Sequence, residues 1–186
     1  MNYQTERMQK LHEAAMHIVE TVGMKFHHPK AIEILKSNGI RCEGDVAYFT
    51  EEQLMYWVRK APFCFTLYGG DAKYDCHFGG EEVNPAPPYG PPYIADKDGK
   101  KRPATIEDYI TFIKLFEANP NYKTNGGPIV AIDGVEPRLA ALAMWYATYT
   151  HSKKVMMIHT GDQAVMSSLI EAAEVAWGGK EALREK

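Results

Sequence analysis

From residue 105 onward, short apolar runs alternate with segments in which apolar residues recur at helical spacing. The runs Pro128-Ile129-Val130-Ala131-Ile132 and Val155-Met156-Met157-Ile158 are continuously apolar, as expected of strands buried on both faces of a parallel sheet. The intervening segments, 137–149 and 163–177, carry apolar residues on one helical face. The pattern therefore predicts two consecutive strand–helix units of an α/β fold.

Two strand–helix units are too few to form a stable sheet, because a two-stranded parallel sheet has long unpaired edges. A closed (β/α)8 barrel needs roughly 250 residues, and the chain has 186 in all. We therefore expect residues 105–186 to be the start of an incomplete (β/α)8 TIM barrel. The chain is then the N-terminal part of a larger protein, or it relies on a partner that covers the sheet.

Residues 1–104 show smaller mixed elements and are predicted to form an α+β extension. Helical spacing is evident in 11–22, 32–35 and 54–58, and the third of these follows a capping-box pattern, Thr50-Glu51-Glu52-Gln53. Two short strands are predicted, at 64–68 and 74–78, with Gly-rich turns beside them.

The segment from Asn84 to Tyr93 contains five prolines and two tyrosines. A flexible linker would be rich in Gly and Ser, whereas this composition predicts a stiff, extended arm. Asp98-Gly99 then predicts a hairpin turn, and Thr105 predicts the N-cap of a new helix with Asp108 three residues on. The arm therefore connects the extension to the barrel and carries Tyr89 and Tyr93 beside it.

Composition narrows the class of protein without identifying it. The formal net charge is -3 and basic residues are scattered, so we expect no nucleic-acid partner. The N-terminus lacks the apolar core of a signal peptide, and no apolar run approaches the ~20 residues of a membrane span. Three cysteines without a CxxC motif indicate reduced thiols in a cytoplasmic protein, with no structural metal site.

Candidate chemistry lies in the two loops that follow the predicted strands, because ligands of α/β proteins bind at the carboxyl ends of strands. Asp133 and His159 can bind a cation or move a proton there. Glu136 and Asp162 stand where helix N-caps stand, and capping is the favoured interpretation for both. Catalytic residues are not assigned, because no nucleophile motif or phosphate-binding glycine loop is present.

Tyr89 and Tyr93 are the remaining candidates. Tyrosine rings on a stiff arm can line a pocket for an organic cation. The alternative, that they pack on the main domain as clamps, is favoured because buried aromatic residues mostly serve packing.

An ordered set of segments resembles the trimethylamine methyltransferase family, the corrinoid-dependent methylamine and betaine methyltransferases. The set comprises LHEAAMHIVETVGMKFHHPKAIEILKSNGI, TEEQLMYWVRKAP followed by FTLYGGD, YIADKDGKKRPATIEDY and HSKKVMMIHTG. The resemblance covers nearly all of the chain, and its specificity comes from the order of the segments rather than from one motif.

The resemblance implies a (β/α)8 barrel with an N-terminal extension. It also implies transfer of a methyl group from a small tertiary or quaternary amine, trimethylamine or a betaine, to the Co(I) of a corrinoid. That corrinoid (methylcobamide once it is methylated) belongs to a separate partner protein, so no cofactor is expected on this chain. For such an enzyme we expect Tyr93, Tyr89, Asp133 and His159 to line the amine pocket, and we expect a homo-oligomer.

Two other classes stay open at this point. The chain can belong to a different α/β barrel enzyme, such as a hydrolase, although no nucleophile is well placed. It can also be a non-catalytic assembly module that acts through an uncovered sheet and the Tyr/Pro arm.

Overall fold

The computed structural model describes residues 5–158 and 160–185, which form two compact units that divide between Pro62 and Phe63. The boundary that we predicted between residues 104 and 105 marks where a barrel would begin, not where one compact unit ends. It stays a prediction.

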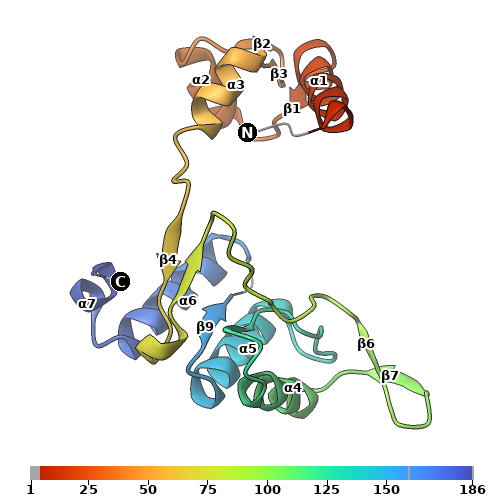
Figure 1. The fold of residues 1–186 in the computed structure, drawn as a ribbon, viewed down its shortest axis with the longest axis vertical. Helices are drawn as coiled ribbons and strands as arrows, with labels where there is room; N and C mark the ends of the chain where they lie inside the picture. Colours follow the sequence, from red (N-terminus) through yellow and green to blue (C-terminus); the bar gives the residue numbers. More distant parts are fainter. Residues whose placement is uncertain (1–4, 159, 186) are drawn as a thin grey trace. The chain divides into compact units, whose positions relative to one another are not determined.

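The first unit contains three helices and a small antiparallel sheet (Figure 1). The helices are α1 (Glu6–Thr21), α2 (Pro29–Ser37) and α3 (Glu51–Val58). The strands β1 (Met24–Lys25), β2 (Arg41–Glu43) and β3 (Val46–Tyr48) pair in the order β1-β3-β2. The sheet was not predicted from the sequence, because its strands are too short to show periodicity.

The core of this unit lies where the sheet meets α2 and α3. Ile40, Ala47 and Phe49 are buried, and partly buried Leu35 and Leu54 pack against them. The predicted capping box at the start of α3 is confirmed, because the Thr50 hydroxyl accepts from the Gln53 N–H while the Gln53 side chain accepts from the Thr50 N–H. By contrast, α1 has no buried residue, so its apolar stripe is not part of this core.

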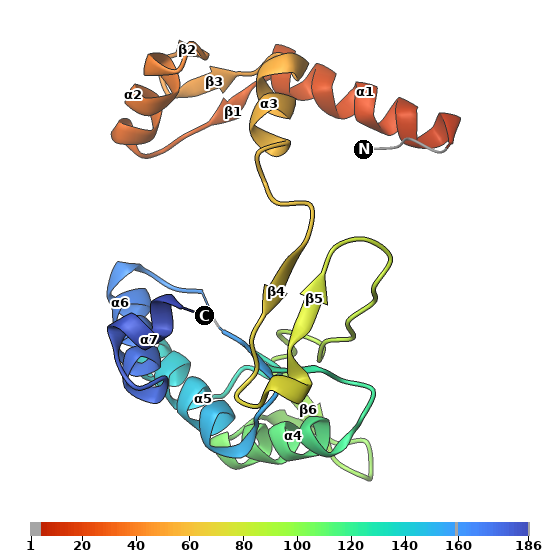
Figure 2. The same ribbon diagram turned by 60° about the vertical axis from the view of Figure 1, so that its left-hand side comes forward.

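The second unit begins with two hairpins joined by the proline-rich arm. Strands β4 (Phe65–Leu67) and β5 (Cys76–Phe78) pair in antiparallel fashion around the short helix η1 (Ala72–Tyr74), as Figure 2 shows. Strands β6 (Tyr93–Ala95) and β7 (Lys101–Pro103) form the second hairpin, which extends away from the helices (Figure 1). The predicted Asp98-Gly99 turn is confirmed, with Gly99 at φ +78°.

The rest of the second unit is helical around one pair of parallel strands. Its helices are α4 (Ile106–Ala118), α5 (Pro137–His151), α6 (Gln163–Ala176) and α7 (Lys180–Arg184). Strand β8 (Thr124–Gly126) pairs in parallel with β9 (Val155–Met157), with Thr124 opposite Val155 and Gly126 opposite Met157. Helix α5 connects the two strands, so β8-α5-β9 is a parallel strand–helix–strand unit, as predicted.

The first parallel strand lies earlier in the chain than predicted. The apolar run 128–132 is wrong as a strand, because the structure places β8 at Thr124–Gly126. Gly126 and Gly127 then adopt φ values of +82° and +71°, which end the extended conformation before the run begins. Ile129 and Val130 are nevertheless buried beside Tyr109 and Ile113 of α4, so the run belongs to the core without belonging to the sheet.

Candidate substrate site at the carboxyl end of the parallel strands

The carboxyl end of β8 is fixed by a buried amide that the sequence analysis did not select. Asn125 is fully buried, and its Nδ2 donates to the Ile113 carbonyl of α4 at 2.9 Å and to the Ser152 hydroxyl after α5 at 3.2 Å. Its Oδ1 accepts from the Gly126 N–H at 2.9 Å. These bonds satisfy the polar atoms of the side chain inside the core and tie β8 to both flanking helices.

Immediately beyond β8, a buried pair of hydroxyls lies beside the Gly127 carbonyl, which also accepts from the Ile129 N–H at 2.9 Å. The Tyr109 hydroxyl donates to the Gly127 oxygen at 2.8 Å and lies 2.9 Å from the Thr148 hydroxyl of α5. Thr148 in turn donates to the Met144 carbonyl at 2.8 Å. Burial raises the pKa of Tyr109 to about 12, so its phenol stays protonated as a donor near neutral pH.

The hydroxyls of Tyr109 and Thr148 have two protons between them but make three short contacts: to the Gly127 carbonyl, to the Met144 carbonyl and to each other. If Tyr109 donates to Gly127 and Thr148 donates to Met144, no proton lies between the two hydroxyl oxygens. If either proton turns to the neighbouring hydroxyl, one of the two carbonyls loses its hydroxyl donor and keeps only its backbone N–H donor. The Gly127 carbonyl is therefore held by a donor whose orientation depends on Thr148.

The proline-rich arm runs along this strand end and is bound to it by backbone groups. The Thr124 hydroxyl donates to the Pro85 carbonyl at 3.2 Å, and the Gly90 N–H donates to the Pro128 carbonyl at 2.8 Å. Further on, the Ala131 N–H donates to the Pro91 carbonyl at 3.1 Å. Segments 85–91 and 124–131 therefore lie side by side in the same chain direction, which makes the arm a wall of the strand-end loop.

Tyr89 of the arm lies against the backbone of Gly127. A Cβ atom on Gly127 would fall 2.5 Å from Cε1 of the Tyr89 ring, closer than real contacts allow. The ring is nevertheless 46% exposed, and partial burial raises the pKa of its phenol. Tyr89 thus presents a neutral aromatic surface at the carboxyl end of β8, a surface that can attract a cation.

The other predicted site residues do not gather around Tyr89. Tyr93 belongs to β6, opposite Pro103, and lines an apolar hollow together with Phe112 and Phe116 of α4. Asp133 is exposed, and its N–H donates to the Ala104 carbonyl at 2.9 Å. The prediction for His159 falls on a position outside the described residues.

The capping interpretation is confirmed for both acidic loop residues. The Glu136 carboxylate accepts from the Leu139 N–H at 3.1 Å at the start of α5. The Asp162 carboxylate accepts from the Val165 N–H at 2.9 Å at the start of α6. Each carboxylate therefore stabilises a helix N-terminus.

Sequence reasoning missed Asn125, Tyr109, Thr148 and Gly127. The predicted strand 128–132 would put Asn125-Gly126-Gly127 before the strand, whereas the structure places Asn125-Gly126 at the end of β8 and Gly127 just beyond it. A glycine pair directly after a polar, buried-strand position was the available signal, since close backbone approach requires glycine. Tyr109 lies in the helix that was predicted to follow Thr105, and nothing in the sequence set it apart from the other apolar residues of that helix.

Metal ligands and membrane spans are absent from the described part of the chain. Within residues 5–158 and 160–185, no group of three or more His, Cys, Asp or Glu side chains is arranged to hold a metal ion. Over the same two ranges, no helix has the length and apolar character needed to cross a bilayer.

Comparison with known proteins gives the family. The model of the trimethylamine methyltransferase (MTTB) family matches residues 2–186. The chain belongs to this family, as the ordered segments of its sequence indicated.

Three curated relatives are similar to the chain over part of their length. A glycine betaine methyltransferase of Desulfitobacterium hafniense (strain Y51) is 30% identical over 181 residues, which is 97% of this chain and 38% of that protein. A proline betaine:corrinoid methyltransferase of Eubacterium limosum is 30% identical over 62% of this chain and 24% of its own length. An L-carnitine:corrinoid methyltransferase of the same organism is 24% identical over 69% of this chain and 26% of its own length. The chain thus spans well under half the length of these relatives.

Proposed function

We propose that the chain is part of an enzyme that moves a methyl group from a quaternary ammonium carboxylate to the Co(I) of a corrinoid carried by a partner protein. One observation carries the choice of substrate. The three relatives are named for glycine betaine, proline betaine and L-carnitine, and each of these molecules combines a quaternary nitrogen with a carboxylate. Trimethylamine, a tertiary amine, is the alternative substrate that the family name keeps open.

The charge of the substrate explains the chemistry that such an enzyme performs. Co(I) supplies an electron pair to the methyl carbon, the C–N bond breaks, and its electron pair stays on nitrogen. A quaternary ammonium leaves as a neutral tertiary amine, so it needs no proton from the protein. The protein then has to orient the cation and remove water from it, and it can do both without a catalytic acid.

Aromatic side chains suit this task, which is why Tyr89 is the preferred contact for the ammonium group. Its ring is half exposed and lies at the carboxyl end of β8, where ligands of α/β folds bind. Asp133 and His159 stay proposed pocket residues, whereas Tyr93, the other predicted pocket residue, is proposed to pack beside α4 as a clamp. In this proposal, Asp133 and His159 come from the loops that follow β8 and β9.

For the fold we propose that residues 105–186 supply the first two strand–helix units of a (β/α)8 barrel. The parallel pairing of β8 with β9, the connection through α5, and the position of α6 after β9 support this assignment. Further parallel strands would then pair along the free edges of this two-stranded sheet. The cognate corrinoid protein and a second copy of the enzyme are the proposed partners.

The test begins with the coding DNA beyond Lys186. If the frame continues, the complete protein is produced and mixed with its corrinoid protein in the Co(I) state. We expect glycine betaine to convert the corrinoid spectrum to that of the methylated form, whereas trimethylamine leaves it unchanged. A response to trimethylamine alone would overturn the choice of substrate, and no response to any methylated amine would overturn the proposed activity. If a stop codon follows Lys186, the same assay is run on the 186-residue chain with the same expectations.

A further inference from the structure

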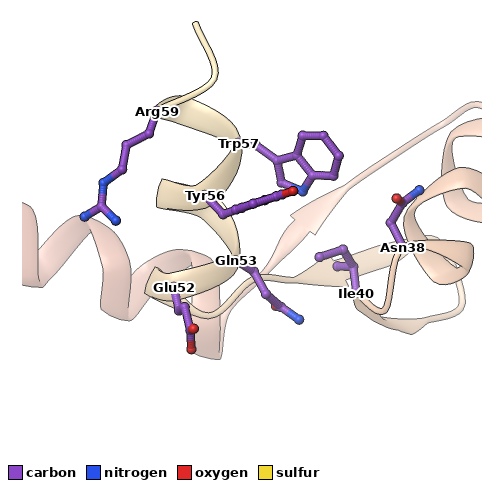
Figure 3. A pocket seen from close by; sticks show the side chains of 7 residues that line it. All are labelled: Asn38, Ile40, Glu52, Gln53, Tyr56, Trp57 and Arg59. Carbon is purple, nitrogen blue, oxygen red and sulfur yellow. The ribbon is translucent and has the colours of Figure 1, made fainter.

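The first unit contains a pocket that the proposed methyl transfer does not use. Its volume is about 520 Å³, within the ~300–1,000 Å³ of small-molecule sites. Figure 3 shows the seven side chains that line it: Asn38, Ile40, Glu52, Gln53, Tyr56, Trp57 and Arg59. Five of the seven come from α3 or its C-cap, and Asn38 and Ile40 face them from the end of α2.

Two adjacent aromatic rings dominate this pocket. Tyr56 and Trp57 lie edge to face, with ring centroids 5.2 Å apart and an interplanar angle of 77°. Tyr56 and Trp57 are 55% and 47% exposed, so part of each ring is not packed in the core. Paired aromatic faces of this kind attract positively charged groups.

A cation already lies against both rings. The ammonium of Lys60, in the turn after α3, is 4.4 Å from the Tyr56 centroid and 4.4 Å from the Trp57 centroid. Among the described residues with lysine–ring contacts, Lys73, Lys153 and Lys154 each reach one ring, at longer distances of 4.8, 5.8 and 5.7 Å. The geometry around Lys60 therefore demonstrates that one cation can contact both rings at once.

The surroundings favour an organic cation with apolar substituents. Trp57 also borders an adjoining apolar groove that is lined by Leu35, Phe49 and Leu54 among others. The charged lining of the pocket is balanced between Glu52 and Arg59, and Arg59 leaves α3 on the side away from Trp57 (Figure 3). Methyl groups on a quaternary nitrogen can therefore pack against Trp57 without facing the guanidinium.

We propose that the Tyr56–Trp57 pair is a binding site for a small quaternary ammonium ion, which displaces the Lys60 ammonium from the rings. All residues of this site belong to the first unit, whereas the strand-end site of β8 belongs to the second. It does not rest on the proposed methyl transfer, because the aromatic pair, the pocket and the Lys60 contact define it. In the free protein, Lys60 acts as an internal competitor for the site.

The test uses the 186-residue chain and choline, followed by the indole N–H signal of Trp57 in nuclear magnetic resonance spectra. A Trp57→Phe variant assigns that signal. The control ligand is 3,3-dimethylbutan-1-ol, which has the shape of choline without its charge. We expect choline to give a saturable shift with a Kd on the order of millimolar, and the alcohol to give no saturable shift. Equal shifts with both ligands would show apolar contact only and would overturn the proposal.

Lys60 variants separate a built cation site from a general charge effect. Lys60→Gln removes the competing ammonium, and we expect choline to bind roughly two- to five-fold more tightly. Lys73→Gln is the matched control, because it removes an ammonium that lies over the single ring of Tyr74, and its affinity should equal that of the wild type. An unchanged affinity in Lys60→Gln, or an equal gain in Lys73→Gln, would overturn the competition and with it the proposal.

A second measurement tests the role of the Trp57 ring by removing it. Trp57→Leu should abolish the choline-dependent shift at the Asn38 side-chain amide across the pocket, while the remaining backbone amide signals report an intact fold. A shift of undiminished size in this folded variant would contradict the assignment of the rings.

Discussion

Tyr89 lies so close to Gly127 that a Cβ atom at position 127 would fall 2.5 Å from the tyrosine ring. The arm and the strand end are far apart in sequence, yet they meet at a position that only glycine fits. This contact, more than any motif, defines the candidate substrate site.

Gly127→Ala is expected to destabilise the second unit by about 2–4 kcal/mol. About 1 kcal/mol comes from placing a side chain at φ +71°, and the rest comes from displacing Tyr89. Gly134→Ala is the matched control, because Gly134 has φ +73° but a Cβ atom added there would meet no described atom within 4 Å. Chemical denaturation measures the free energy of unfolding of both variants. Equal losses would show that the Tyr89 ring moves away from position 127 at no measurable cost.

The hydroxyl pair at Gly127 predicts unequal effects for two conservative changes. Tyr109→Phe removes the hydroxyl donor from the buried Gly127 carbonyl, which keeps the Ile129 N–H at 2.9 Å, and we expect a loss of about 1–1.5 kcal/mol. Thr148→Val lets Tyr109 donate to Gly127 without competition, so we expect a loss below about 1 kcal/mol. Thr150→Val is the control, because it removes the same kind of bond from a threonine hydroxyl to a helix carbonyl, but at an exposed position. A larger loss for Thr148→Val than for Tyr109→Phe would contradict this hydrogen-bond order.

Asp108 predicts an acid-sensitive contribution to the stability of the second unit. Hydrogen bonds from Arg102 at 2.6 and 2.7 Å, together with the Thr105 N–H at 2.9 Å, hold the pKa of Asp108 well below its usual range. A carboxyl with a lowered folded-state pKa stabilises the fold above its unfolded value of about 4, and the contribution is lost as pH falls toward the folded-state pKa.

We therefore expect Asp108→Asn to cost about 1 kcal/mol at pH 7, a modest figure because Arg102 is half exposed and its attraction is screened by solvent. The cost should shrink as pH falls below about 4. Glu107→Gln, which removes a charge from the same helical turn, is the control. Urea denaturation at several pH values measures both, and a cost that does not change with pH would exclude the ionic origin.

In the complete enzyme, Tyr89→Leu is expected to raise KM for a betaine by roughly 2- to 30-fold, as the loss of one cation–π contact implies. Tyr93→Phe should leave KM unchanged, because Tyr93 lines the apolar hollow beside α4 and packs there as a clamp. Steady-state assays with the reduced corrinoid protein check both variants. A large rise in KM for Tyr93→Phe would count against the clamp, and an unchanged KM for Tyr89→Leu would remove Tyr89 from the ammonium site.

Features that depend on neighbouring residues were predictable from the sequence. The capping boxes at Thr50 and Thr105, the cap at Asp162 and the hairpin turn at Asp98-Gly99 all follow from side chains within a few positions of each other. Each of these elements forms where it was predicted.

Features that depend on distant partners were not predictable in the same way. Strand β8 exists because Thr124–Gly126 pairs with Val155–Met157 and because the Asn125 amide finds partners on two helices. In the more apolar run 128–132, the one β pairing among the described residues is an isolated parallel bridge from Ile132 to Ala104. The family, by contrast, was recognisable because segment order along the chain is a property of the sequence alone.

The bonds between the arm and the strand end join a segment that is made early to one that is made later during synthesis. The Thr124 hydroxyl bonds to the carbonyl of Pro85, and the Pro128 carbonyl bonds to the N–H of Gly90, so the arm leaves the ribosome well before its partners do. Until residues 124–131 emerge, the arm has neither its backbone bonds nor the glycine that Tyr89 packs on. The prolines reduce the conformational entropy that the arm loses when it binds residues 124–131, because they keep the arm extended before its partner is made.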